Sequence, residues 1–182
     1  MKTVRLNHLR AALLPAAAAL LAGVGLLVVI FYAQPAESTP PGKSGKIAYS
    51  GKDAPNGDFE IYTIKSGGGG KVPVTDNTRN DYNPAYSPSG KQIVYSASDG
   101  QDLELYKINA GGGGKVQLTD NAADDLAPSY SPSGKKIAYS GLESPNTASE
   151  NFEIYTINSG GGGKVPVTDT GTDDDSPSWG SS

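Results

Sequence analysis

The residues with the most scope for chemistry in this chain are carboxylates that recur just ahead of short Pro-x-aromatic segments. Six of them are candidate site residues: Asp81, Asp124, Asp125, Asp173, Asp174 and Asp175. Gathered on one surface, such side chains would bind a basic or cation-bridged partner, because a field of one sign steers association. Each aspartate alone has a simpler use, since Asx side chains commonly hydrogen-bond the backbone of their own loop. Both interpretations stay open at this point.

Composition narrows the catalytic chemistry open to the chain. There is no cysteine, which excludes a thiolate nucleophile, a thiolate metal site and a disulfide framework. The single histidine, His8, precedes a long apolar stretch and cannot serve a site in the rest of the chain. Ser-His-Asp catalysis and histidine-based zinc sites are excluded with it. We expect a protein that is not an enzyme and carries no cofactor.

A metal site needs more than acidity. The run Asp173 to Asp175, with Asp169 before it, offers the oxygen ligands that Ca²⁺ prefers. Its spacing does not match a defined calcium loop such as D-x-[DN]-x-[DN]-G. We therefore expect no metal among these residues.

Charge is distributed unevenly along the chain. The net charge is −4, and the three basic residues Lys2, Arg5 and Arg10 all precede the apolar stretch. The remainder carries 12 Lys and Arg against 19 Asp and Glu. Such an acidic domain is poorly suited to binding phosphates, so we expect no nucleic-acid partner.

One unit of sequence occurs three times between residues 46 and 182. Its copies share the string Ile-(Ala or Val)-Tyr-Ser, and the tyrosines of that string, Tyr49, Tyr95 and Tyr139, are 46 and 44 residues apart. Each copy also holds short segments rich in β-branched and aromatic residues, which predict strands. A period of this length with several strands per unit is typical of β-propeller blades.

Glycine clusters at 67–70, 111–114 and 160–163 predict tight turns, because glycine adopts positive φ without strain. A phosphate-binding loop is a weak interpretation, since Gly-Lys-Ser/Thr must open a helix there, whereas Gly-Lys-Val here opens another strand.

Apolar residues occupy both faces of the strand segments. A blade stacked between two other blades needs that pattern.

The string Pro84-Ala-Tyr-Ser-Pro-Ser-Gly-Lys-Gln-Ile-Val-Tyr95, followed by an Ile-containing strand, the glycine cluster and Leu118-Thr119, resembles the TolB-type β-propeller repeat. The family motif is Pro-x-Trp-Ser-Pro-Asp-Gly-Lys-x-Ile-(Ala/Val)-Phe. The resemblance covers residues 46–182 and departs from the motif in two ways. Tyrosine stands for tryptophan at Tyr86 and Tyr130, although Trp179 retains it. Serine replaces the aspartate of the turn at Ser89 and Ser133.

The resemblance implies an all-β propeller and a style of binding. It implies a non-catalytic protein- or ligand-binding scaffold in a bacterial cell envelope, and it does not name the partner. The alternative from another class is a propeller-type hydrolase or lyase that uses acidic channel residues and a metal.

In the family the Pro-x-Trp strand is innermost, and we label the four strands of a blade A to D from that strand outward. The chain then begins with strands B to D of one blade, contains two full blades at about 82–119 and 126–168, and ends with a lone A strand, Ser176–Trp179. Three blades are fewer than the four to eight of known propellers. We expect two copies to complete one six-bladed ring as a homodimer, with an open three-blade unit as the alternative.

The strand order also sorts the charges. B–C and D–A loops emerge at one end of the blades, which collects the acidic residues. A–B and C–D turns emerge at the other end, which collects a set of lysines: Lys46, Lys71, Lys91, Lys115, Lys135, Lys136 and Lys164.

Residues 11–33 form an apolar run long enough for a helix to cross a membrane. Basic residues in front of it predict that residues 1–10 are a cytoplasmic tail. Residues 34–45 are rich in Pro, Ser and Gly and predict a stalk. We expect a single-pass signal anchor at the cell membrane with residues 46–182 extracytoplasmic; a cleaved signal peptide is the alternative.

Overall fold

The computed structural model of this chain describes residues 45–55, 57–142 and 151–180. All of its strands lie in the compact unit Thr39–Ser182. The expected tail at 1–10, the expected membrane helix at 11–33 and all but the last residue of the expected stalk lie outside the described residues. In the part of the chain that is described, no helix has the length and apolarity needed to span a bilayer.

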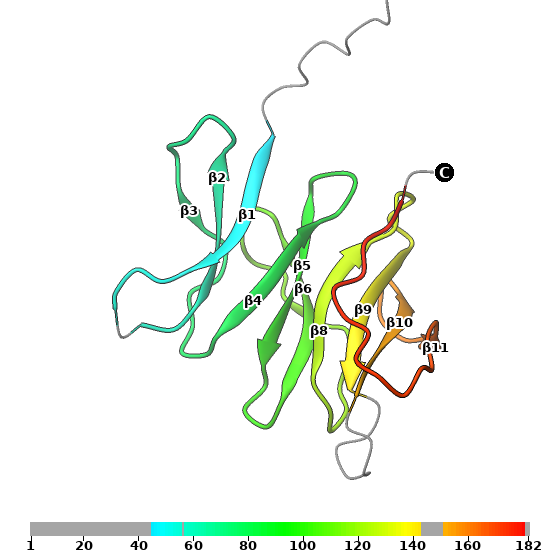
Figure 1. The fold of residues 1–182 in the computed structure, drawn as a ribbon. Helices are drawn as coiled ribbons and strands as arrows, with labels where there is room; N and C mark the ends of the chain where they lie inside the picture. Colours follow the sequence, from blue (N-terminus) through cyan, green and yellow to red (C-terminus); the bar gives the residue numbers. More distant parts are fainter. Residues whose placement is uncertain (1–44, 56, 143–150, 181–182) are drawn as a thin grey trace, which may run out of the picture. The chain divides into compact units, whose positions relative to one another are not determined.

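The described strands form three antiparallel sheets, as the repeat predicted (Figure 1). We call them blades 1, 2 and 3. Blade 1 has three strands: β1 (Lys46–Gly51), β2 (Glu60–Lys65) and β3 (Val72–Pro73). Blade 2 has four: β4 (Asp81–Tyr86), β5 (Gln92–Ser98), β6 (Leu103–Asn109) and β7 (Val116–Gln117). Blade 3 repeats them: β8 (Asp125–Tyr130), β9 (Lys136–Leu142), β10 (Phe152–Asn158) and β11 (Val165–Pro166).

Local chemistry sets the turns between strands. In blade 2 the β5–β6 hairpin is closed by Asp99, whose Oδ1 accepts from the backbone N–H of Gln101 at 2.7 Å. The next reversal uses the glycine cluster, where Gly112, Gly113 and Gly114 all have positive φ. Asn109 and Gly112–Gly113 exchange two backbone hydrogen bonds across this turn. The predicted turn role of the glycines is confirmed.

Each blade presents one face rich in tyrosine, its aromatic face, and one rich in branched aliphatic residues, its aliphatic face. Between blades 1 and 2, Ile61 and Val74 pack against Ile93, Tyr95 and their neighbours. Between blades 2 and 3, the aliphatic face of blade 2 meets the aromatic face of blade 3 in the same way. The buried side chains of this second junction are Val94, Leu105, Leu118, Tyr130, Ile137, Tyr139, Tyr155 and Ile157. The aromatic face of one blade thus covers the aliphatic face of the blade before it.

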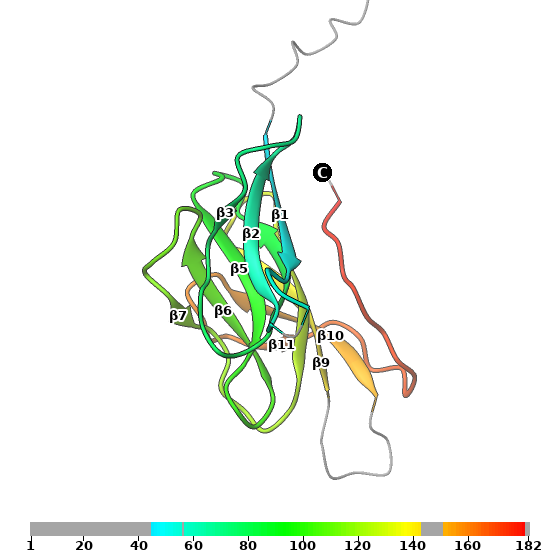
Figure 2. The ribbon, with the colours of Figure 1, turned by 90° about the vertical axis from the view of Figure 1, so that its left-hand side faces the viewer.

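Residues Ser176–Trp179 were expected to form a lone A strand, one with no partner strand in its own chain. In the described structure this segment is paired with no strand and belongs to no sheet. Figure 2 shows residues 170–180 running alongside the sheets without a paired neighbour. The backbone nevertheless starts like β4: Asp174 N–H donates to the Phe152 carbonyl at 2.7 Å, as Asp81 N–H does to Phe59.

Candidate functional site

The six candidate aspartates lie at the start of β4 and β8 and in the corresponding segment after blade 3. Two of them, Asp81 and Asp125, are fully buried at 0% exposure. Asp124 and Asp174 are half-buried, and Asp173 and Asp175 are exposed. Asp81 and Asp125 are therefore not part of a partner-binding surface in this structure, because a buried carboxylate cannot contact a partner directly.

The buried aspartates belong to a network that joins consecutive blades, which we call the carboxylate latch. In the latch between blades 2 and 3, the Asn121 side-chain amide donates to Glu104 of β6 and, at 2.9 Å, to Asp125 of β8. The backbone N–H of Asn121 donates to the other Glu104 oxygen. One asparagine therefore bridges carboxylates of two blades.

The same latch connects blades 1 and 2. Asn77 donates its backbone N–H to Glu60 at 2.6 Å and its side-chain amide to Asp81 at 2.8 Å. After blade 3 a threonine replaces the asparagine: Thr170 N–H donates to Glu153 at 2.8 Å, and its hydroxyl donates to Asp174 at 3.1 Å. The network is thus a repeated structural element of the blades.

Burial changes the proton affinity of the latch. Loss of solvent raises the pKa of Glu104 to about 7 and that of Asp125 to about 6. The pKa of Glu60 is also raised, chiefly by burial. Glu153, which has no further blade beside it in the described structure, differs: donation from the Thr168 hydroxyl and the Thr170 N–H lowers its pKa. Burial between the blades thus raises the pKa of Glu60, Glu104 and Asp125 above the ordinary values of these side chains.

The residue before each latch aspartate has a second backbone role. Asp124 Oδ1 accepts from the N–H of Leu103 at 2.8 Å, and Asp173 Oδ1 accepts from the N–H of Phe152 at 3.0 Å. Asn80 fills the same place in blade 1, accepting from Phe59 N–H at 2.9 Å. An uncharged amide serves equally well, which shows that this position needs a hydrogen-bond acceptor and not a negative charge.

Exposed carboxylates remain at the same end of the blades. Asp76, Asp120 and Asp169 each follow the threonine that ends the outer strand region, and all three are exposed. Among the described residues, no three His, Cys, Asp or Glu side chains come together as a metal site. Asp169 and Asp173–Asp175 are included in that finding.

Three of the predicted surface lysines lie over tyrosine rings. Lys71, Lys115 and Lys164 place Nζ at 3.8, 4.1 and 3.9 Å from the ring centroids of the β2, β6 and β10 tyrosines. Lys71 also pairs with Asp53. These lysines therefore cover aromatic rings of their own blades, and their charges are partly committed to those contacts.

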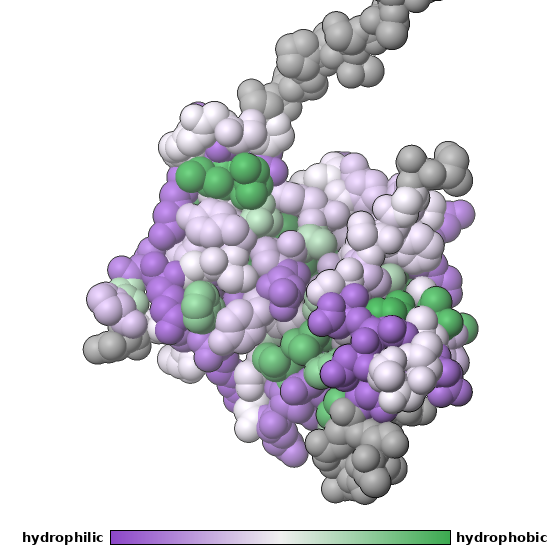
Figure 3. Space-filling view, viewed as in Figure 1, coloured by the Kyte–Doolittle hydropathy of each residue, from purple (hydrophilic) through white to green (hydrophobic). Residues whose placement is uncertain are grey.

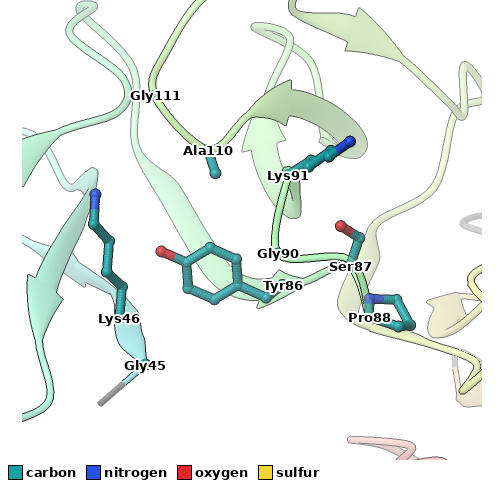
Figure 4. Close-up of a pocket in the computed structure, with 9 residues that line it drawn as sticks. All are labelled: Gly45, Lys46, Tyr86, Ser87, Pro88, Gly90, Lys91, Ala110 and Gly111. Carbon is teal, nitrogen blue, oxygen red and sulfur yellow. The ribbon is translucent and has the colours of Figure 1, made fainter. Parts of the chain in front are cut away.

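A cavity of about 600 Å³ lies between the start of β1 and the β4–β5 turn of blade 2. Figure 4 shows the Tyr86 ring between Lys46 on one side and the turn Ser87–Lys91 on the other. At the next blade junction the corresponding place is filled, because Pro88 lies 3.5 Å from the position that a Cβ on Gly134 would take. The equivalent Gly90 has open space around it.

Sequence reasoning missed the latch glutamates and asparagines. A signal was present, since Glu60, Glu104 and Glu153 each precede their latch partner by 17 residues. Glutamate in a strand and asparagine in a loop are both ordinary surface choices, so the recurrence alone did not reveal burial.

Comparison with known families identifies a close match for most of the chain. The family model described as "TolB beta propeller domain" matches residues 40–182. No curated protein sequence matches significantly.

Solved structures show the same fold. A putative TolB from Agrobacterium tumefaciens is 20% identical with a TM-score of 0.61, covering 74% of this chain and 50% of that chain. TolB from Acinetobacter baumannii is 23% identical with a TM-score of 0.58, covering 69% of this chain and 31% of that one. An oligogalacturonate lyase from Vibrio parahaemolyticus is 13% identical with a TM-score of 0.51, covering 70% and 37%. The chain therefore spans half or less of the length of these proteins.

Proposed function

The chain belongs to the TolB beta propeller domain family, and from that premise we propose that it is a non-catalytic scaffold that binds a protein or ligand. We place it at a bacterial cell membrane, tethered through residues 11–33 with the blades outside. The observation that carries the proposal is the use of the loop carboxylates. Those nearest the blade junctions are buried and accept hydrogen bonds from backbone and amide groups in the latch, which supports a structural role for them.

The exposed carboxylates support a partner with basic or cation-bridged chemistry. Asp76, Asp120 and Asp169 recur once per blade and are exposed. Charges that repeat across neighbouring blades present one sign over an extended area, and such a field speeds the encounter with an oppositely charged partner.

Binding is tested with a synthetic Lys/Arg-rich peptide and the full-length chain in detergent, over a series of salt concentrations. We expect salt-dependent binding that falls about tenfold when Asp76, Asp120 and Asp169 are all changed to Asn. The matched control changes the same three residues to Glu, which keeps the charge and should keep the affinity. Binding that ignores both salt and the Asn variant would refute the electrostatic surface.

Membrane topology is tested with single cysteines, because the natural chain has none. Ser133→Cys lies in an exposed turn of blade 3, and Thr3→Cys lies in the expected cytoplasmic tail. A membrane-impermeant maleimide should label Ser133→Cys in intact spheroplasts and Thr3→Cys only after lysis. Labelling of Thr3→Cys in intact spheroplasts would contradict the proposed orientation.

The catalytic alternative has its own test. A fold shared with an oligogalacturonate lyase at 13% identity carries no substrate with it. The purified chain is incubated with Mn²⁺ and oligogalacturonates, and unsaturated product is followed by its ultraviolet absorbance. Product formation above a heat-inactivated control would replace the scaffold proposal by a lyase-type propeller.

A further inference from the structure

The two outermost faces of the described blades are uncovered, although their equivalents inside the stack are buried. On the aromatic face of blade 1, Ile47 is 50% exposed, whereas the equivalent Ile93 and Ile137 are both 0% exposed. Figure 3 shows a hydrophobic patch over the β1–β2 hairpin. The residue types are the same, so the difference comes from a missing neighbour.

At the opposite end of the stack, the aliphatic face of blade 3 is exposed in the same way. On the aliphatic face of blade 3, Val167 is 59% exposed, whereas the equivalent Val74 and Leu118 are 6% and 8% exposed. Inside the stack an aromatic face always covers an aliphatic face. The two uncovered faces are therefore the two halves of one such junction, carried at opposite ends of the same chain.

The free edge of β1 has a known complement in the fold. The residues Lys46-Ile-Ala-Tyr-Ser50 of β1 are identical to Lys136–Ser140 of β9. In β9 this sequence pairs with β8 on one edge and β10 on the other. In the described structure β1 pairs with β2 alone, so its second edge is unpaired.

The segment 174–179 has the shape of the strand that this edge lacks. Strands β4 and β8 carry a bulge with positive φ at Asn83 (50°) and Ala127 (49°). Ser176, at the equivalent position, has a φ of 53°. Trp179 stands where Tyr86 and Tyr130 stand, and its indole N–H donates to the Ser129 carbonyl at 3.0 Å. The segment therefore contacts blade 3 and shares the positive φ of the inner strands at Ser176.

We propose that two copies of this chain close one six-bladed ring, in which the segment 174–179 of each copy completes blade 1 of the other. The register follows from β4–β5 and β8–β9. Because Ala85 pairs with Val94 and Ser129 with Ala138, Ser178 of one copy pairs with Ala48 of the other. By the same rule Trp179 pairs with Ile47.

This arrangement would cover the exposed end faces and pair the unpaired edge of β1 at the same time. Each end face is covered by its complement, the β1 edge is paired, and both junctions are equivalent under a twofold axis. The 600 Å³ cavity beside Gly90 lies where Pro88 sits at the next junction. In the proposed ring, the chain that follows Trp179 of the other copy would enter it. This inference goes beyond the proposed binding function and does not depend on it.

The test is disulfide cross-linking of the full-length chain between Ala48→Cys and Ser178→Cys, on a background with no other cysteine. The two single variants are coexpressed and oxidised, then separated on a non-reducing gel. We expect a covalent dimer from the mixture and none from either variant alone. Ser178→Cys with Ser133→Cys is the control, since Ser133 lies in the exposed turn of blade 3 and should give no link.

A second measurement is the protein mass of the full-length chain in detergent by light scattering. Ile47→Asp and Val167→Asp should each reduce the dimer fraction about tenfold. Val116→Asp is the matched control: Val116 is 46% exposed, like its equivalents Val72 and Val165, and lies on neither end face. The double variant Ala48→Cys/Ser178→Cys linking only within one chain, or a monomer mass for wild type, would overturn the proposal. The absence of any link in the mixture of the two single variants would also overturn it.

Discussion

At the scale of residues, the latch shows how position decides the chemistry of a carboxylate. Glu104 and Asp125 are excluded from water by the blades on either side, and the Asn121 amide donates to both. Because burial disfavours the charged form, the folded protein holds protons there that the unfolded chain releases. The latch is thus a hydrogen-bonded joint between blades whose strength depends on pH.

We expect the free energy of unfolding to decrease between pH 5 and pH 8. The pKa values of Glu104 and Asp125 are raised to about 7 and about 6 in the fold. Their favourable contribution is full below the pKa values of the unfolded chain and is lost as pH rises through the folded values. The loss is on the order of 2 kcal/mol. Urea unfolding at the two pH values measures it.

Two variants isolate the cause of this pH dependence. Glu104→Gln removes one titrating group, so the difference in stability between pH 5 and pH 8 should shrink. Glu153→Gln is the control: the pKa of Glu153 is lowered, so this group stays ionised over the range. Its replacement should reduce stability about equally at both pH values. Equal slopes for wild type and Glu104→Gln would show that the latch is not responsible.

At the scale of elements, the inner strands share a bulge that places a residue at positive φ. The register shifts between Tyr82 and Ala85 in β4 and between Leu126 and Ser129 in β8. Asparagine adopts left-handed backbone more readily than alanine does. Asn83 therefore suits the bulge, whereas Ala127 is strained there.

We expect Ala127→Asn to raise the free energy of unfolding by about 0.5 kcal/mol and Asn83→Ala to lower it by a similar amount. Each variant gives one blade the bulge residue that the other blade has in the natural chain. Thermal unfolding monitored by circular dichroism measures both. If both variants shift the midpoint in the same direction, backbone strain at the bulge is not the controlling factor.

At the scale of the whole molecule, the three similar blades leave one aromatic and one aliphatic face that no other described residues cover. Fully burying a side chain such as isoleucine or valine contributes about 1.5–3 kcal/mol. The exposure of Ile47 and Val167 therefore represents stabilisation that a single copy does not obtain. In the proposed ring, a second copy would supply this stabilisation at both ends at once.

We expect the thermal midpoint to rise with protein concentration, because association stabilises only the folded chain. A tenfold increase in concentration should raise it by a few degrees, on the order of 3 °C. Calorimetry at three concentrations measures the shift. Ile47→Asp should abolish the dependence and Val116→Asp should keep it. A midpoint independent of concentration in wild type would argue against the ring.

Much of the fold could be predicted from the repeat. Local preferences predict the strands around Tyr49, Tyr95 and Tyr139, their antiparallel order and the glycine turns. The same preferences recur in each copy of the repeat. The candidate site was harder to predict. Asp81 and Asp125 were candidates for an acidic surface because the strand order places their loops at one end of the blades. No local feature marks the amide that lets these two aspartates be buried.

The identical segments Lys46–Ser50 and Lys136–Ser140 show most clearly which features the sequence determines and which the tertiary structure determines. The sequence by itself determined that both form a B strand with the same register to the strand that follows. The tertiary structure alone decided that Ile137 is buried and Ile47 is half exposed. Strand formation depends on the backbone and side-chain preferences of the segment itself, whereas burial depends on which surfaces lie against it. Those surfaces come from residues far away in the chain, or from another chain.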